Sequence, residues 1–131
     1  MIEAADEGRV PGSLSLSFEV FPPKNDAQAD QISEVAVSLE PFKPAFISVT
    51  YGAGGSTRER SVATVHRLAR ETSVPLAAHL TCVGASCRAL DAVIDDFRSY
   101  GVERFVVLRG DSPDGVGAAY RPHPQGFQDT S

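Results

Sequence analysis

A repeat of roughly 30 residues, a strand pattern followed by a helix pattern, most constrains the fold of this chain. Apolar strand-like runs begin near residues 14, 45, 76 and 104. Strands that alternate with helices predict a parallel sheet, either an open doubly wound sheet or a (β/α)₈ barrel. A complete barrel takes about 250 residues. The 131 residues of this chain therefore correspond to about half of one.

Periodicity and capping residues set the expected boundaries of the repeat. Strands are expected over 14–20, 45–50, 76–82 and 104–108. Three helices should follow the first three strands, beginning at Asn25 or Asp26, at Ser56, and at Ser86. Ser56 and Glu59 have capping-box spacing, and Gly101 is the expected stop of the third helix. In the first strand Leu14, Leu16, Phe18 and Val20 alternate onto one face. In the first helix Ile32, Val35, Ala36 and Leu39 recur at helical spacing.

Composition excludes several classes of partner. The formal net charge is −5 and no run of Lys or Arg exists, which argues against nucleic acid and anionic membranes. No apolar stretch approaches the ~20 residues of a transmembrane helix. Residues 1–12 are acidic without an apolar core, so we expect a flexible N-terminal tail and a cytoplasmic protein. Cys82 and Cys87 have neither zinc-site nor disulfide-framework spacing and are expected to be free thiols.

All four expected strands end in polar, chemically capable residues, whereas the strand bodies are mostly apolar. The strand-end residues are Glu19, Thr50 with Tyr51, His79 with Thr81, and Arg109-Gly110-Asp111. Both candidate folds bind ligands at the carboxyl ends of their parallel strands. The pattern therefore predicts a functional site at this edge of the sheet.

Each member of this set also has a plainer interpretation. Glu19 alone could be a solvated strand end, and His79 alone could be a structural residue. The glycine-rich loop 51–57 lacks phosphate-loop and dinucleotide spacing, so it is either a tight turn or a close backbone approach to a ligand. Glu19, His79 and Asp111 could alternatively be the ligands of a facial metal site, which would make the protein a metal-dependent barrel enzyme.

Four segments, in order, resemble the methylenetetrahydrofolate reductase family. They are SFEVFPPK over 17–24, ISVTYGAGGSTRER over 47–60, AHLTC over 78–82 and LRGD over 108–111. The resemblance covers about residues 13–131. It implies the first four βα units of a (β/α)₈ TIM barrel, truncated before its fourth helix. It also implies flavin-dependent reduction of 5,10-methylenetetrahydrofolate to 5-methyltetrahydrofolate in one-carbon metabolism and methionine biosynthesis.

The resemblance also implies roles for individual residues. Glu19 matches the family's general acid, and its apolar flanks, which disfavour the charged carboxylate, are compatible with that role. Asp111 matches an aspartate beside the flavin and the pterin. The positions matching FAD contacts are Thr50, Tyr51, Ala53, His79, Arg109, Gly110 and Asp111. FAD is the implied cofactor, NADH or NADPH the co-substrate, and folate the substrate, with no resident metal.

The chain departs from the family pattern at three points. Val20 replaces the more common Phe, and Asp129 lies where an aromatic residue is common. The sequence stops where a fourth helix should start, so strands five to eight are expected from a missing C-terminal half. We expect little activity from the isolated chain and a homo-oligomeric complete enzyme. The alternative is a truncated fragment or assembly partner with no chemistry of its own.

Overall fold

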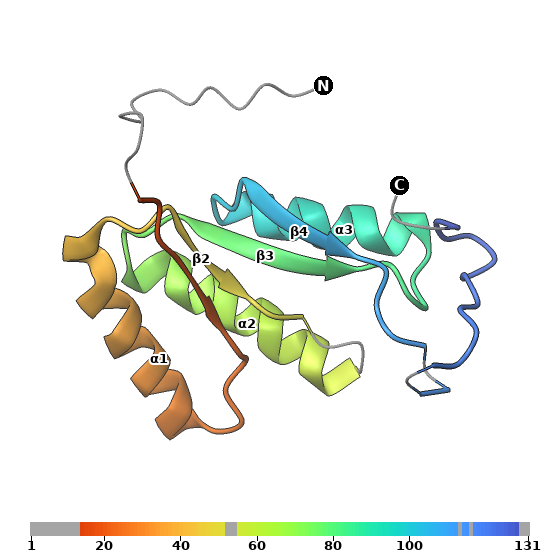
Figure 1. Ribbon diagram of the computed structural model, residues 1–131, viewed down its shortest axis with the longest axis horizontal. Helices are drawn as coiled ribbons and strands as arrows, with labels where there is room; N and C mark the ends of the chain where they lie inside the picture. Colours follow the sequence, from red (N-terminus) through yellow and green to blue (C-terminus); the bar gives the residue numbers. More distant parts are fainter. Residues whose placement is uncertain (1–13, 52–54, 113, 116, 129–131) are drawn as a thin grey trace.

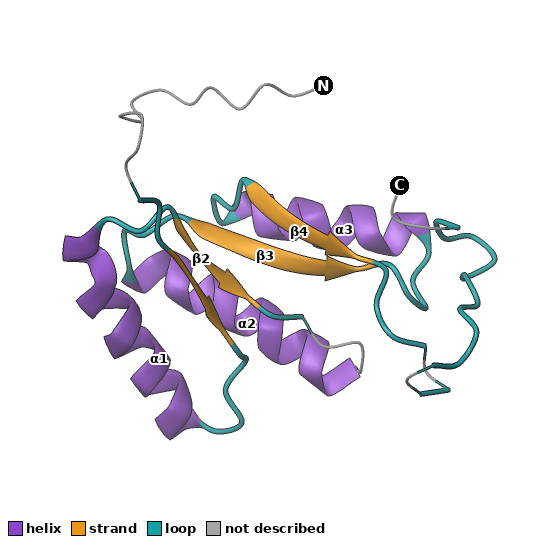
Figure 2. Ribbon diagram, in the orientation of Figure 1, coloured by secondary structure: helices purple, strands orange, loops and turns teal. Residues whose placement is uncertain are grey.

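Four parallel strands joined by three helices form one sheet in a computed structural model of the chain (Figures 1 and 2). The structure describes residues 14–51, 55–112, 114–115 and 117–128, with 55–57 described by their backbone alone. The strands are β1 (Ser17–Val20), β2 (Phe46–Val49), β3 (Leu76–Thr81) and β4 (Arg104–Leu108). The helices are α1 (Asp26–Leu39), α2 (Gly55–Glu71) and α3 (Cys87–Ser99), with a short 3₁₀ turn, η1 (Glu40–Phe42), after α1.

Each strand pairs in parallel with the strand before it, so the sheet order is β1-β2-β3-β4. The register places Glu19 beside Ser48, Ala78 beside Phe105, and His79 beside Val106. Parallel pairing confirms the α/β class and the strand–helix repeat. The order is sequential across the whole sheet, with no reversal among the described strands.

Alternate residues of the strands make two different faces. The covered face packs against the helices, and its core includes Ile47 and Val49 of β2, Leu68 of α2 and Phe97 of α3. The open face holds the intervening residues, which we define as Ser17, Glu19, Phe46, Ser48, Ala77, His79, Thr81, Arg104, Val106 and Leu108. At roughly 25 cal/mol per Å² of buried apolar surface, the covered face is the main source of stability.

Local signals place the helices as expected at two of their three starts. The Asn25 side chain accepts a hydrogen bond from the Gln28 N–H at 2.9 Å, and Ser86 accepts one from the Ala89 N–H at 3.2 Å. These bonds satisfy otherwise free N–H groups in the first turn. Gly101 follows α3 with φ of +83°, a conformation that glycine adopts without a steric penalty. The expected cap at Ser56 lies outside the described side chains.

The apolar patterns of the first strand and the first helix hold only in part. The first strand begins at Ser17 rather than at residue 14, and Leu14 and Leu16 are exposed. They precede the paired part of β1, and no element among the described residues covers them. Val35 of α1 is also exposed, because the buried side of that helix is centred on Ser33 and Ala36. The expected first helix is otherwise confirmed.

The segment after β4 folds back over the turn between β3 and α3. The Cys87 N–H donates to the Gln125 carbonyl at 2.8 Å. Gly126 approaches so closely that an added Cβ would lie 2.5 Å from the Ala85 carbonyl oxygen. No helix occurs in the described part of this segment. Within the described residues, no helix is long and apolar enough to span a membrane.

Candidate functional site

Three polar side chains from three successive strands meet on the open face. The Glu19 Oε2 atom lies 3.2 Å from His79 Nε2. Ser48, between them on β2, has its hydroxyl oxygen 3.4 Å from the same Oε2 atom. The predicted convergence of strand ends is therefore confirmed for Glu19 and His79. Ser48 is a member that the sequence reasoning missed.

Glu19 is more solvated than its flanking residues suggested. Its side chain is 50% exposed. Phe18 and Val20 point to the covered face and pack against the core, and Phe21 is itself exposed. Strand alternation explains the difference, because the neighbours of a residue along a strand lie on the opposite face of the sheet. The expectation that these apolar flanks desolvate the carboxylate is therefore not met in the described part of the chain.

The neighbouring strand ends provide a buried hydroxyl and a close backbone approach. Thr81 is buried, and its hydroxyl has no hydrogen-bond partner among the described residues. Gly110 has φ of +84°, and an added Cβ would lie 2.5 Å from Val83 Cγ1 and 3.1 Å from Thr81 Cβ. Only glycine fits this position without displacing its neighbours. An unpaired buried hydroxyl is costly, so Thr81 is a candidate to bind a ligand.

The other two residues of the Arg109-Gly110-Asp111 segment lie at the surface. Arg109 is exposed, and its guanidinium carbon lies 5.1 Å from the centre of the Tyr120 ring. Its carbonyl accepts a hydrogen bond from the Val83 N–H at 2.9 Å, which ties the end of β4 to the turn after β3. Asp111 is exposed and makes no hydrogen bond or ion pair with a described residue.

The end of β2 has a different character. The Thr50 carbonyl accepts a hydrogen bond from the Ser61 hydroxyl at 2.8 Å, which anchors the strand end to α2. The Tyr51 ring is buried in the covered-face core, and its hydroxyl has no partner among the described residues. Burial raises the pKa of the Tyr51 phenol, partly offset by Arg58, whose guanidinium carbon lies 5.5 Å from the ring centre. Ala53 lies outside the described residues.

The metal-site hypothesis finds no support in the described part of the chain. No group of three or more His, Cys, Asp or Glu side chains there could hold a metal ion. Glu19 and His79 lie together, but Asp111 does not join them. Cys82 and Cys87 are free thiols, as expected. Burial raises the pKa of the Cys82 thiol, and the neighbouring Cys87 adds to this effect.

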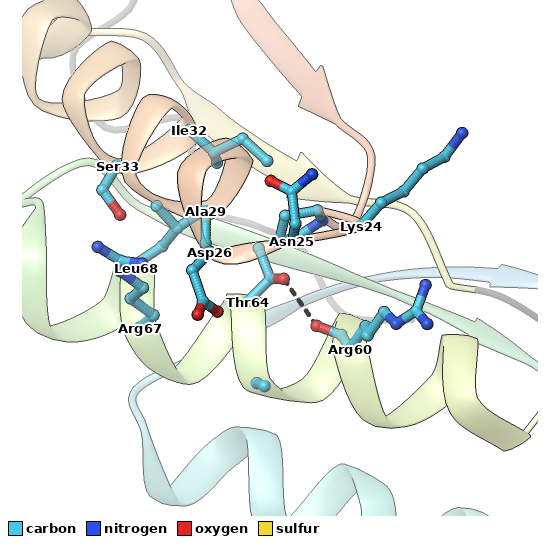
Figure 3. A pocket seen from close by; sticks show the side chains of 12 residues that line it. Lys24, Asn25, Asp26, Ala29, Ile32, Ser33, Arg60, Thr64, Arg67 and Leu68 are labelled. Carbon is cyan, nitrogen blue, oxygen red and sulfur yellow. Dashed lines mark hydrogen bonds between the residues drawn. The ribbon is translucent and has the colours of Figure 1, made fainter.

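A groove of about 270 Å³ lies between α1 and α2, on the helix side of the sheet (Figure 3). Several of its polar side chains are engaged within the protein. Asn25 caps α1, and the Thr64 hydroxyl donates to the Arg60 carbonyl at 2.6 Å. Arg67 pairs with Asp30 at 2.7 Å and with Glu71 at 3.0 Å. These contacts describe helix packing, and the groove contains none of the strand-end residues.

The fold and the site together define an α/β protein with polar groups gathered on the open face of a parallel sheet and at its carboxyl edge. Residues 4–131 match the model of the methylenetetrahydrofolate reductase family. The chain is 35% identical over 108 residues to the 5,10-methylenetetrahydrofolate reductases of Salmonella typhimurium and Escherichia coli. It is 32% identical over 115 residues to a Zea mays relative named methylenetetrahydrofolate reductase (NADH) 1.

The chain belongs to the methylenetetrahydrofolate reductase family. This confirms the resemblance carried by the four strand-end segments and supports the enzyme class. The matches cover 82% of this chain but 36% of each of the two bacterial relatives, and 88% of this chain but 19% of the maize relative. The chain thus spans about a third of the length of these bacterial relatives.

Proposed function

We propose that residues 13–131 form the first four βα units of a (β/α)₈ barrel. Two features of the sheet support this. Its strands lie in chain order, and the core that packs against the covered face includes residues of all three helices. An open doubly wound sheet reverses its strand order and carries helices on both faces. In a barrel, the open face would become the interior.

The two outer strands support the presence of further strands in the working protein. β1 and β4 each pair on one side only among the described strands. Val107 and Leu108 at the end of β4 are about half exposed. An apolar edge strand is a pairing surface that soluble proteins usually cover or charge. We propose that a C-terminal segment supplying strands five to eight covers these edges.

The proposed activity is the reduction of 5,10-methylenetetrahydrofolate to 5-methyltetrahydrofolate with NADH or NADPH. The observation that carries it is the Glu19 carboxyl, held beside His79 and Ser48 in a chain of this family. Glu19 would act as the general acid. Its O–H bond would break as an N–H bond forms at a folate nitrogen, leaving the carboxylate and an opened, electrophilic iminium.

The carboxyl edge of the sheet has features that fit FAD. Gly110 packs closely against Thr81 and Val83 at this edge, and the Thr81 hydroxyl is buried without a partner among the described residues. Bound FAD would supply the hydride chemistry. The residues proposed to hold it are Thr50, Tyr51, Ala53, His79, Arg109, Gly110 and Asp111. Asp111 would also place a negative charge beside the bound flavin, and this charge would disfavour further negative charge on the reduced flavin ring.

The cofactor assignment is tested by reconstitution. The purified chain is mixed with FAD, alone and together with the segment of the Salmonella typhimurium relative that lies beyond the matched region. We expect protein-bound flavin absorbance near ~450 nm in the mixture. Absence of bound flavin from both preparations would contradict the assignment. We expect little or no folate reduction by the chain alone; full activity without the added segment would contradict the need for it.

The acid role is tested by Glu19→Gln in the same reconstituted assembly. Folate reduction should fall by about 10²- to 10⁴-fold, the usual range for a lost general acid, while transfer from NAD(P)H to flavin is retained. Glu103→Gln, at a position exposed before β4, is the matched control and should change neither rate. Equal loss of both half-reactions in Glu19→Gln would remove the acid role and leave only a structural one.

A further inference from the structure

The two oxygens of the Glu19 carboxyl differ in their hydrogen bonding to the described residues. Oε2 lies 3.4 Å from the Ser48 hydroxyl and 3.2 Å from His79 Nε2. Oε1 accepts no hydrogen bond from a described residue. The asymmetry matters because a carboxylic acid carries its proton on one oxygen, while the other serves as an acceptor.

Ser48 is placed rigidly for this contact. It lies directly beside Glu19 in the parallel register, on a strand bonded on both sides, and is 3% exposed. Its hydroxyl has a second possible acceptor, the Phe18 carbonyl, also at 3.4 Å. A hydroxyl has one proton to donate, so the two acceptors compete. The Phe18 carbonyl belongs to the backbone of the same strand as Glu19, so either choice keeps Ser48 against β1.

We propose that Ser48 is a positioning residue that donates to Glu19 Oε2 and thereby leaves the transferable proton on Oε1. The inference rests on the proposed acid role of Glu19. With Oε2 fixed as the acceptor, Oε1–H is the bond that breaks when the folate nitrogen gains its N–H bond. The carboxylate formed then keeps Oε2 against the Ser48 hydroxyl, so the side chain stays in place for its next proton.

Isotope-edited infrared spectroscopy tests this without cofactor or substrate. Spectra are recorded at acidic pH on protein labelled with ¹³C in its glutamate carboxyls, and the difference from Glu19→Gln identifies the Glu19 band. The C=O stretch falls in frequency when its oxygen accepts a hydrogen bond. Ser48→Ala should therefore shift this band to higher frequency, and Ser48→Thr should restore it. Ser33→Ala, which removes a buried serine from α1, is the control and should leave it unchanged.

An unshifted band in Ser48→Ala would overturn the proposal, because the hydroxyl would then be bonded to the Phe18 carbonyl. Should Ser48→Ala fail to fold, Ser48→Cys replaces it, since a thiol is a weak donor and shifts the band in the same direction. In the reconstituted assembly, Ser48→Ala should slow folate reduction by about two- to tenfold, the range for one net hydrogen bond, and spare flavin reduction. Retained folate reduction in Glu19→Gln would instead refute the acid role itself, whatever the band shows.

Discussion

The two faces of the sheet are built from alternate residues of the same four strands, yet they hold different kinds of side chain. The covered face is apolar and packs against the helices through residues such as Ile47, Val49 and Phe97. The open face holds Glu19, Ser48, His79 and Thr81, three of them buried polar groups. Burying polar groups lowers stability unless they find partners. The difference indicates that one face supplies stability, and it supports the proposal that the other face binds a ligand.

The largest expected effect comes from removing the main aromatic residue of the covered face. Phe97 is 1% exposed and packs near the Phe105 and His66 rings. Phe97→Ala should lower the free energy of unfolding by about 3–5 kcal/mol, from lost burial and the cavity left behind. Urea denaturation measures this. A loss below about 1 kcal/mol would contradict the view that the covered face supplies the stability, because ordinary surface substitutions already change it by up to about 0.5 kcal/mol.

Gly110→Ala should have the next largest effect, and it should change both stability and ligand binding. The positive φ costs on the order of 1 kcal/mol or more for any other residue, and the new Cβ would also meet Val83. Gly101→Ala is a matched control, because φ there is +83° and nothing lies within 4 Å of an added Cβ. Denaturation of both variants, with FAD titration in the reconstituted assembly, separates the two causes. Equal destabilisation and equal FAD affinity would show that the close approach at Gly110 has no consequence.

Two threonines of similar burial should respond in opposite directions. Thr81 is 5% exposed and its hydroxyl has no partner among the described residues, whereas Thr64 is 6% exposed and donates to Arg60. Thr81→Val should be neutral or stabilising by about 1 kcal/mol without ligand, and should weaken FAD binding. Thr64→Val should destabilise by about 1 kcal/mol and leave FAD binding unchanged. If the two variants lost stability and FAD affinity to the same extent, the argument that Thr81 binds a ligand would fail.

The smallest effect concerns acid sensitivity far from the open face. Glu40 accepts hydrogen bonds from the Ser73 N–H at 2.7 Å and the Thr72 hydroxyl at 2.8 Å, and these lower the pKa of its carboxyl. A depressed folded-state pKa contributes stability above the unfolded-state value, and that contribution is lost as pH falls through the folded-state pKa. Glu40→Gln should therefore flatten the decline of melting temperature below about pH 4.5. Glu103→Gln is the control; a decline as steep in Glu40→Gln as in the unaltered protein would contradict the assignment.

Much of the fold could be predicted because local signals and the repeat agree. Strand patterns alternating with helix patterns place β2 and β4 almost to the residue. Asn25, one of two expected caps, caps α1, and α3 begins after Ser86 as expected. The errors occur where tertiary contacts decide burial. Leu14 and Leu16 continue the alternation of β1, but the paired strand begins only at Ser17.

The site could be predicted at the level of strand ends but not of contacts. Glu19 and His79 were expected to converge, and in the structure Glu19 Oε2 and His79 Nε2 lie 3.2 Å apart. Ser48 was overlooked because it sits inside an apolar strand, and only the register reveals that it lies beside Glu19. The sequence contained a usable signal, because Ser48 is a polar residue within a buried strand and such a residue needs a hydrogen-bond partner. The prediction that apolar flanks desolvate Glu19 failed because residues that neighbour it along the strand lie on the opposite face of the sheet.

The sequential order of the sheet has a consequence for how the protein is made. Every strand pairs with the one synthesised just before it, so no pairing waits for a distant segment. Chains emerge from the ribosome N-terminus first at about 5–20 residues per second, far more slowly than helices or short strand pairs form. The strands β1 and β2, together with the helix α1 that connects them, can therefore pack together before β4 has been translated. Vectorial synthesis would then favour assembly of the sheet from one edge, with Glu19 and Ser48 brought together first.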